Sequence, residues 1–393
     1  MSARSSPRSA LISSRPEPPM AHPWSVMHSY KQAIRTMTAL TVFVLGSFLP
    51  ASRACAQNLK KQHTAIVSLQ DQTALTLQTL MDRYETPSRS DWRDLHAWQR
   101  FVTVSTLSDY EITSGNTRFH DSALNALKNR QGLDGNDDDL WVAQADLDMA
   151  RFTHSPTQVQ DARNIFDTIA SKYWDGHCGG GIWWDHARTY KNAITNELFL
   201  STAARLYRFT HEAVYRNWAL KSWAWFRSSG MIAPDNLIND GLDNQCRNNG
   251  SPAYSYNQGV ILDGLLEIST LTEAGAPQQT ASRIALAAIR TFTSSTGTFQ
   301  ELGGLMNTDA RIFRGLFVRA LGHVAASEID NTTRIVIADW LSQQARSAWN
   351  TRKPDALISD TWNNHPFHAS AQGQITAASI FMAAALSRGT ETP

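Results

Sequence analysis

The sequence of 393 residues has almost no net charge, because 36 Lys and Arg residues oppose 35 Asp and Glu residues and leave a formal charge of +1. Charged side chains make up only 18% of the chain, and no dense stripe of Lys and Arg occurs. Proteins that bind nucleic acid usually need such a stripe to neutralise phosphates. We therefore expect no nucleic-acid partner. The hydrophobic fraction of 42% is ample for a large core.

The sequence also lacks the motifs of common cofactor and metal sites. Its glycine run, Gly179-Gly180-Gly181, is not followed by Gly-Lys-Ser/Thr and is therefore no phosphate loop. No zinc motif occurs, the twelve His residues are scattered, and the Asn- and Asp-rich segments lack the spaced oxygen ligands of a calcium loop. No Ser, His and Asp order of a catalytic triad can be recognised. We expect neither a cofactor nor a metal.

The N-terminal segment has no apolar run long enough to span a membrane. Residues 1–36 are basic and rich in Ser and Pro, and a short apolar run from Leu40 to Leu49 precedes Ala54-Cys55-Ala56. A charged region, a short apolar core and a small-residue cleavage site together predict a signal peptide over residues 1–56, removed after Ala56. We therefore expect a secreted or periplasmic protein without a stable membrane span.

Cysteine is scarce, with three residues at positions 55, 178 and 246. Acylation of Cys55 would make the chain a lipoprotein, but Ser52 and Arg53 fit that pattern poorly. After cleavage Cys178 and Cys246 remain, and an oxidising compartment would allow them to pair. The sequence does not give the distance between them, so a disulfide and two free thiols both stay open.

What the sequence does contain is helical periodicity over most of its length. Apolar residues recur three or four positions apart, as one face of a helix requires. One such series consists of Leu140, Ala143, Leu147 and Ala150. Eleven or twelve helices fit the chain, stacked as an α-solenoid or closed into a toroid of paired helices.

The loops favour the closed toroid. No repeat consensus of a solenoid occurs, and two long loops rich in Gly, Asn and Trp, 175–190 and 230–258, stand among short polar links. Long loops at intervals are typical of a barrel with one functional face. We predict an all-α (α/α)6 barrel, formed as a single domain over residues 57–388 and followed by a flexible tail at 389–393.

Three consecutive carboxylates, Asp137, Asp138 and Asp139, open one predicted helix just before Leu140 and Trp141. Acidic residues at a helix start can simply cap it and suit the helix dipole. One cap accounts for one or two of them, whereas three adjacent carboxylates repel one another. The alternative is catalysis, because a glycosidase needs two carboxyl groups in different protonation states beside the bond that it breaks.

A helix start could create these two protonation states. The dipole should keep one carboxylate ionised as a nucleophile, while repulsion from its neighbour and shielding by Trp141 should raise the pKa of the other, as suits a general acid. Closely spaced carboxyl groups leave no room for a water molecule between carboxylate and sugar. The pair therefore favours retention of configuration over inversion.

Further segments offer candidate sugar-binding residues. Thirteen Trp is a high number for this length, and many lie beside Gly, Asn and Asp, where flat rings can stack on sugars or simply pack. The amides and carboxylates of residues 239–250 can bind hydroxyl groups or satisfy their own loop through Asx-turns. Glu197 is expected to brace a loop and not to act in catalysis. The candidates for substrate binding are Trp141, Trp183, Trp184, Lys191, Asn192, Asn239, Asp240, Asp243, Tyr256, Asn257 and Gln258.

In this order, the segments resemble glycoside hydrolase family 76, the α-1,6-mannanases, over most of the mature chain except its first eighty residues. The shared motifs are Asp-Asp before Trp, Gly-Gly-Gly-Ile-Trp-Trp, Tyr-Lys-Asn-Ala followed by Asn-Glu-Leu, Asn-Asp-Gly-Leu-Asp, Tyr-Asn-Gln-Gly, Phe-Arg-Gly-Leu-Phe-Val-Arg and Ser-Ala-Trp-Asn. The resemblance implies an (α/α)6 barrel with Asp137 as nucleophile and Asp138 as acid/base. Asp139 stands where the family often has Glu. Val142 stands where the family usually has a second Trp.

The resemblance also implies the substrate. We expect a retaining, endo-acting hydrolase of α-1,6-mannosidic bonds in mannan, acting as a monomer. The family includes fungal wall proteins thought to transfer glycans, so a transglycosylase acting on mannose-containing wall glycans is the nearest alternative. A non-catalytic carbohydrate-binding barrel is the other alternative, although binding alone has no need of two repelling acids.

Overall fold

The computed structural model describes residues 67–272, 275–363 and 366–389. The predicted signal peptide lies outside the described residues, as does most of the predicted tail. Contacts gather Ile66–Pro393 into one compact unit. Within the part of the chain that is described, no helix is both long and apolar enough to cross a membrane.

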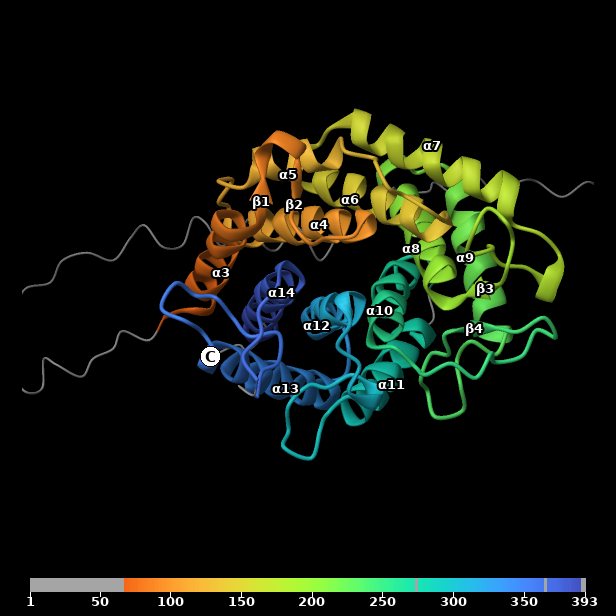
Figure 1. Cartoon of the computed structure of the whole chain (residues 1–393). Helices are drawn as coiled ribbons and strands as arrows, with labels where there is room; N and C mark the ends of the chain where they lie inside the picture. The colour runs from red at the N-terminus through yellow and green to blue at the C-terminus, as the bar shows by residue number, and fades with distance from the viewer. Residues whose placement is uncertain (1–66, 273–274, 364–365, 390–393) are drawn as a thin grey trace, which may run out of the picture. The chain divides into compact units, whose positions relative to one another are not determined.

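Twelve α-helices lie in the described ranges of this unit and alternate between two rings (Figure 1). The inner ring consists of α4 (Ala97–Ser114), α6 (Asn136–Thr153), α8 (Ala193–Thr210), α10 (Ser255–Ser269), α12 (Thr308–Ala326) and α14 (Ala371–Arg388). The outer ring consists of α3 (Leu69–Tyr84), α5 (His120–Leu127), α7 (Pro156–Tyr173), α9 (Ala213–Ser228), α11 (Ala276–Thr291) and α13 (Asn331–Asn350). Each inner helix packs against the next, and α14 packs against α4 and closes the ring. The prediction of an (α/α)6 barrel is confirmed.

The two rings differ in how completely their helices are buried. In α8 every residue from Ala193 to Leu206 is buried, because this helix has neighbours on all sides. The outer helix α7 is amphipathic and buries only one stripe, which includes Ala162, Phe166 and Ile169. The apolar series from Leu140 to Ala150 lies in the inner helix α6, so periodicity in the sequence locates this helix and understates how much of it is buried.

Glycine allows the inner helices to approach one another closely. A Cβ atom on Gly259 of α10 would lie 2.7 Å from the Cα of Phe317 in α12. A Cβ atom on Gly322 of α12 would lie 2.8 Å from the Cα of Ala383 in α14. Larger side chains at these two positions would push the neighbouring helices apart and open the ring.

The connections are unequal at the two ends of the barrel. Links from an inner to the next outer helix are short, such as 154–155 and 211–212, whereas the segments that enter α8, α10, α12 and α14 are long. Because the chain alternates between the rings, every inner helix begins at the same end, and the long segments gather there. They comprise 174–192, 229–254, 292–307 and 351–370.

Small structural elements order the loops. The strands β1 (Glu85–Thr86) and β2 (Asp91–Trp92) pair antiparallel, and so do β3 (Lys191–Asn192) and β4 (Gly241–Leu242). The β3–β4 pair connects segment 174–192 to segment 229–254. Three short 3-10 helices span Pro87–Arg89, His177–Gly179 and Leu302–Gly304.

Candidate active site

The aspartate pair lies at the elaborated end of the barrel, in the first turn of α6. Gly135 precedes this turn with φ 123°, a conformation that side chains disfavour. A Cβ atom there would lie 2.8 Å from Oδ1 of Asp137 and 3.4 Å from the carbonyl oxygen of Trp184. Glycine at this position therefore lets the chain turn into the helix directly beneath the Asp137 carboxylate.

Asp137 has one hydrogen-bonded and one free carboxylate oxygen. Its Oδ2 accepts a hydrogen bond from Nε1 of Trp184 at 3.2 Å, whereas Oδ1 is buried and finds no partner among the described residues. Burial, and then the charge of Asp138, raise the pKa of Asp137 to about 7. Burial therefore works against the helix dipole, which was expected to keep one member of the pair ionised.

Asp138 is buried beside its partner, and its Oδ2 accepts a hydrogen bond from the backbone N–H of Asp134 at 2.9 Å. Burial raises the pKa of Asp138 to about 6. Two adjacent carboxyl groups with raised pKa values titrate as a unit and tend to hold one proton between them near neutral pH. Asp139 lies nearer the surface, 3.9 Å from the ring nitrogen of His186.

Trp183 and Trp184 contact different carboxylates. Trp183 donates its indole N–H to Asp175 at 2.7 Å, and its ring stacks on His177 with centroids 5.0 Å apart. Trp184 donates to Asp137, as described above. Of the two tryptophans expected to bind sugar, Trp184 thus contacts the aspartate pair and Trp183 contacts its own loop.

Lys191 and Asn192 serve the loops. The ammonium group of Lys191 is fully buried and donates to Asp175, to the carbonyl oxygen of His177 and to that of Gly180 at 2.6–2.8 Å. This uses all three of its hydrogens, so the expectation that Lys191 binds substrate needs correcting. The side chain of Asn192 accepts from the backbone N–H of Thr195 and caps α8.

The loop that leads to α10 was expected either to bind sugar hydroxyl groups or to satisfy its own backbone, and its two carboxylates differ in this respect. Asp243 accepts from the backbone N–H groups of Gln245 and Arg247, so it folds its own loop, and these hydrogen bonds lower its pKa. Asp240 is partly buried and accepts from Asn249 at 2.9 Å, and burial raises its pKa. The charge of Asp240 also raises the pKa of Glu197 and of Tyr256, so this carboxylate lies near both side chains.

Amide side chains near this loop have equally different roles. Asn239 donates to the carbonyl oxygen of Gly230, and Gln258 is fully buried and bonds both the N–H and the carbonyl of Ile238. Asn257 is also fully buried, but neither atom of its amide has a hydrogen-bond partner in the described part of the chain. Asn239 and Gln258 thus hold the loop in place, whereas the binding of substrate by Asn257 stays a prediction.

Glu197 does not brace a loop, contrary to expectation. Its carboxyl group is fully buried, and neither oxygen has a hydrogen-bond partner among the residues that the structure describes. Burial, and then the charge of Asp240, raise the pKa of Glu197 well above its usual range. The bracing is done by its neighbour Asn196, whose side chain bonds both the N–H and the carbonyl of Ile182.

An aromatic arc follows the beginnings of the inner helices. Trp141 of α6 stacks on Trp98 of α4 with centroids 5.8 Å apart, and Phe313 of α12 lies 6.3 Å from Trp98. Tyr256 of α10 stacks on Phe313 at 4.0 Å. Trp98 and Phe313 were missed by the sequence analysis. Their signal was their place near helix starts. Trp98 is the second residue of α4, and Phe313 is the sixth residue of α12, as Trp141 is of α6.

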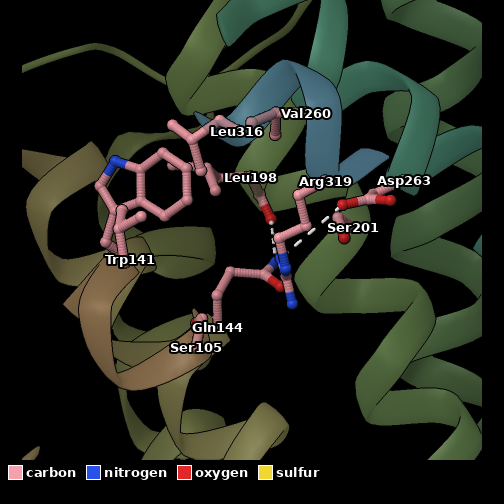
Figure 2. Close-up of a pocket in the computed structure, with 10 residues that line it drawn as sticks. Ser105, Trp141, Gln144, Leu198, Ser201, Val260, Asp263, Leu316 and Arg319 are labelled. Atoms are coloured by element: carbon pink, nitrogen blue, oxygen red, sulfur yellow. Dashed lines mark hydrogen bonds and ion pairs between the residues drawn. The ribbon is translucent and has the colours of Figure 1, made fainter. Parts of the chain in front are cut away.

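Trp141, a member of this arc, also lines a small cavity (Figure 2). Trp141 and Leu316 line it on one side, and Gln144, Asp263 and Arg319 bring polar groups into it from three inner helices. The barrel axis therefore changes from aromatic near the aspartate pair to charged further along the helices.

The sequence left open whether Cys178 and Cys246 form a disulfide, and the structure shows that they do. Cys178 and Cys246 form a disulfide with their Cα atoms 5.2 Å apart, which cross-links segments 174–192 and 229–254. With His177 they are also the group of described residues whose donor atoms, all within 4.8 Å of one another, could hold a metal ion. Sulfur atoms paired in a disulfide are not available as thiolate ligands.

The barrel thus carries a half-buried and a buried aspartate side by side among aromatic rings, and a pair of carboxyl groups is what glycoside hydrolysis requires. Residues 68–392 match the family model described as glycosyl hydrolase family 76, and the chain belongs to this family.

Among curated proteins, the chain is 27% identical over 351 residues to the mannan endo-1,6-alpha-mannosidase DCW1 of Eremothecium gossypii, covering 79% of this chain and 76% of the relative. It is 27% identical over 316 residues to the protein of that name in Saccharomyces cerevisiae, covering 72% and 70%.

Solved structures share the fold at low sequence identity. The GH76A alpha-1,6-mannanase from Salegentibacter sp. HEL1_6 superposes with a TM-score of 0.73 at 18% identity and covers 81% of this chain and 100% of its own. Dfg5 from Chaetomium thermophilum, in complex with glucosamine, gives a TM-score of 0.70 at 20% identity and covers 83% and 92%.

Proposed function

We propose that this protein is a retaining, endo-acting glycoside hydrolase that cleaves α-1,6-mannosidic bonds in mannan. The observation that carries the proposal is the pair of half-buried Asp137 and buried Asp138 in the first turn of α6, with aromatic rings of three other inner helices nearby. Curated relatives named mannan endo-1,6-alpha-mannosidase support the substrate. So does an inactive Salegentibacter mannanase, with two consecutive aspartates replaced, in complex with alpha-1,6-mannotriose.

In the first step, the carboxylate of Asp137 attacks the anomeric carbon, and the glycosidic bond breaks as Asp138 gives its proton to the leaving oxygen. A covalent glycosyl-enzyme forms. In the second step, Asp138 takes a proton from water as its oxygen attacks the same carbon and releases Asp137. Two displacements at one carbon retain its configuration. Trp141, Trp184, Asp240 and Tyr256 are the groups of the original candidate set that we propose contact the sugar.

Transglycosylation is the nearest alternative, because the same glycosyl-enzyme would form and a sugar hydroxyl would replace water in the second step. A non-catalytic glycan-binding barrel is the other alternative. The raised pKa values of Asp137 and Asp138 speak for catalysis, since buried, mutually repelling acids add nothing to the binding of a neutral sugar.

Product analysis on linear α-1,6-mannan tests the proposal. We expect wild-type protein to release α-configured mannooligosaccharides, seen by NMR before mutarotation, without added metal and in the presence of EDTA. Asp137→Asn and Asp138→Asn should release almost none. Longer products formed from a mannooligosaccharide alone would indicate transglycosylation, and binding without any product would indicate a non-catalytic barrel.

We also propose that the chain is exported and cleaved near Ala56. The Cys178–Cys246 disulfide supports this, because structural disulfides persist in oxidising compartments. The mass of the secreted protein should correspond to a chain that begins at or close to residue 57. An intact N-terminus on protein recovered from the cytoplasm would contradict the proposal.

A further inference from the structure

The Trp183–Trp184 segment is fastened to the start of α6 by its backbone. The backbone N–H of Asn136 donates to the carbonyl oxygen of Trp184, and the Asn136 side chain donates to that of Trp183, both at 2.8 Å. Asn136 is fully buried and immediately precedes the aspartate pair. These buried hydrogen bonds to Asn136 thus fix the position of the two tryptophans relative to Asp137.

Tyr190 holds the ring of Trp184 in one orientation. The backbone N–H of Trp184 donates to the carbonyl oxygen of Tyr190 at 2.9 Å, and the two ring centroids lie 5.3 Å apart. Tyr190 is itself held against the backbone at Gly241, where a Cβ atom would come within 2.9 Å of its ring. These contacts aim the indole N–H of Trp184 at Asp137.

This N–H meets only one of the two oxygens of Asp137. It donates to Oδ2 at 3.2 Å, while Oδ1 is buried without a partner among the described residues. Indole nitrogen is a donor and never an acceptor, so the contact favours the ionised carboxylate over the protonated one. It also opposes the burial that raises the pKa of Asp137.

We propose that Trp184 is a positioning residue for Asp137, whose indole N–H holds Oδ2 and thereby fixes the orientation of the carboxylate that attacks the anomeric carbon. The inference rests on the proposed function for its catalytic meaning. It is distinct from the use of Trp184 as a flat sugar-binding surface, because it depends on the N–H group and not on the ring face.

The test separates these two uses of the ring. Trp184→Phe keeps an aromatic face and removes the donor. Loss of a hydrogen bond to a charged group should lower kcat/KM on an aryl mannoside roughly 10- to 100-fold. The effect should fall on kcat with little change in KM, and the acidic limb of the pH profile should move to higher pH because Asp137 becomes harder to ionise. Trp183→Phe is the matched control, since it removes the indole bond to Asp175 at 2.7 Å and should leave the limb in place.

A measurement without substrate keeps this test separate from that of the proposed function. Titration of the Asp137 carboxyl carbon by NMR should give a higher pKa in Trp184→Phe than in wild type, and the wild-type value in Trp183→Phe. Should Trp184→Phe fold poorly, benzothienylalanine at position 184 preserves the ring shape and replaces N–H with sulfur. An unmoved Asp137 pKa, or a variant that loses affinity but keeps kcat, would overturn the inference.

Discussion

Replacing Asp138 with alanine should leave the first step of hydrolysis intact on an activated aryl mannoside, whose leaving group needs no proton, and stall the second. The glycosyl-enzyme on Asp137 should then accumulate, and azide should release it as a product of retained configuration. On mannan, which needs protonation in the first step, the same variant should lose roughly 10²- to 10⁴-fold in rate. Burst kinetics and intact-protein mass measure both results.

Asp137→Ala should instead lose the first step on every substrate, because no nucleophile remains. Azide can then attack from the vacated side and give a product of inverted configuration. The ligand-free pKa values, about 7 for Asp137 and about 6 for Asp138, do not assign the two roles, since a bound sugar changes both environments. The rescue experiment does assign them.

Asp139→Asn is the control for this pair. It removes a third carboxylate of the same turn, which lies nearer the surface and close to His186, and it should cost much less activity. Exchange of the two rescue patterns would exchange the roles of Asp137 and Asp138. Inverted configuration in the wild-type product would exclude the retaining mechanism itself.

Arg319→Met should lower the free energy of unfolding by about 3–5 kcal/mol, as is usual when one member of a buried charge network is removed. Arg319 of α12 contacts Asp109 of α4 at 2.5 Å, Asp148 of α6 at 3.1 Å and Asp263 of α10 at 3.8 Å. Its side chain is only 14% exposed, so water replaces little of the lost interaction. Urea denaturation at pH 7 measures the cost.

The loss of stability caused by Arg319→Met should depend on pH. Positively charged neighbours lower the folded-state pKa of Asp148, against the effect of burial, and His323 and Arg319 do the same for Asp263. Their contribution to stability is therefore present above the unfolded pKa of about 4 and is lost as the pH falls. Without Arg319 the pKa values of Asp148 and Asp263 are lowered less, so the cost of the substitution should shrink as the pH falls toward 4.

Two variants check the cause. Arg83→Met removes an exposed ion pair with Asp355 on the outer ring and should cost less than about 1 kcal/mol. Adding Asp109→Asn to Arg319→Met should restore part of the lost stability. Without Arg319, the buried Asp109 carboxylate keeps only the longer contacts with Arg151 at 3.7 Å and His323 at 4.0 Å. A cost for Arg319→Met no larger than that for Arg83→Met would mean that the network is well solvated.

Much of this protein is determined by local sequence. Periodicity of apolar residues determines the helices, and the alternation of short and long links indicates a barrel with one elaborated end, because both depend on neighbouring residues alone. The adjacency of Asp137 and Asp138 is likewise a property of the sequence. Their place in the first turn of a helix follows from the apolar stripe that begins at Leu140.

The tertiary structure decided what each polar side chain does. Lys191 donates all three of its ammonium hydrogens to groups of its own loop. Asp243 accepts hydrogen bonds within its own turn, while Asp240 remains partly buried. Asn196 braces the loop that Glu197 was expected to hold. Burial raised the pKa of Asp137 where the helix dipole alone predicted the opposite. Burial and hydrogen-bond partners depend on segments that are distant in sequence, and only the closing of the helical ring brings these segments together.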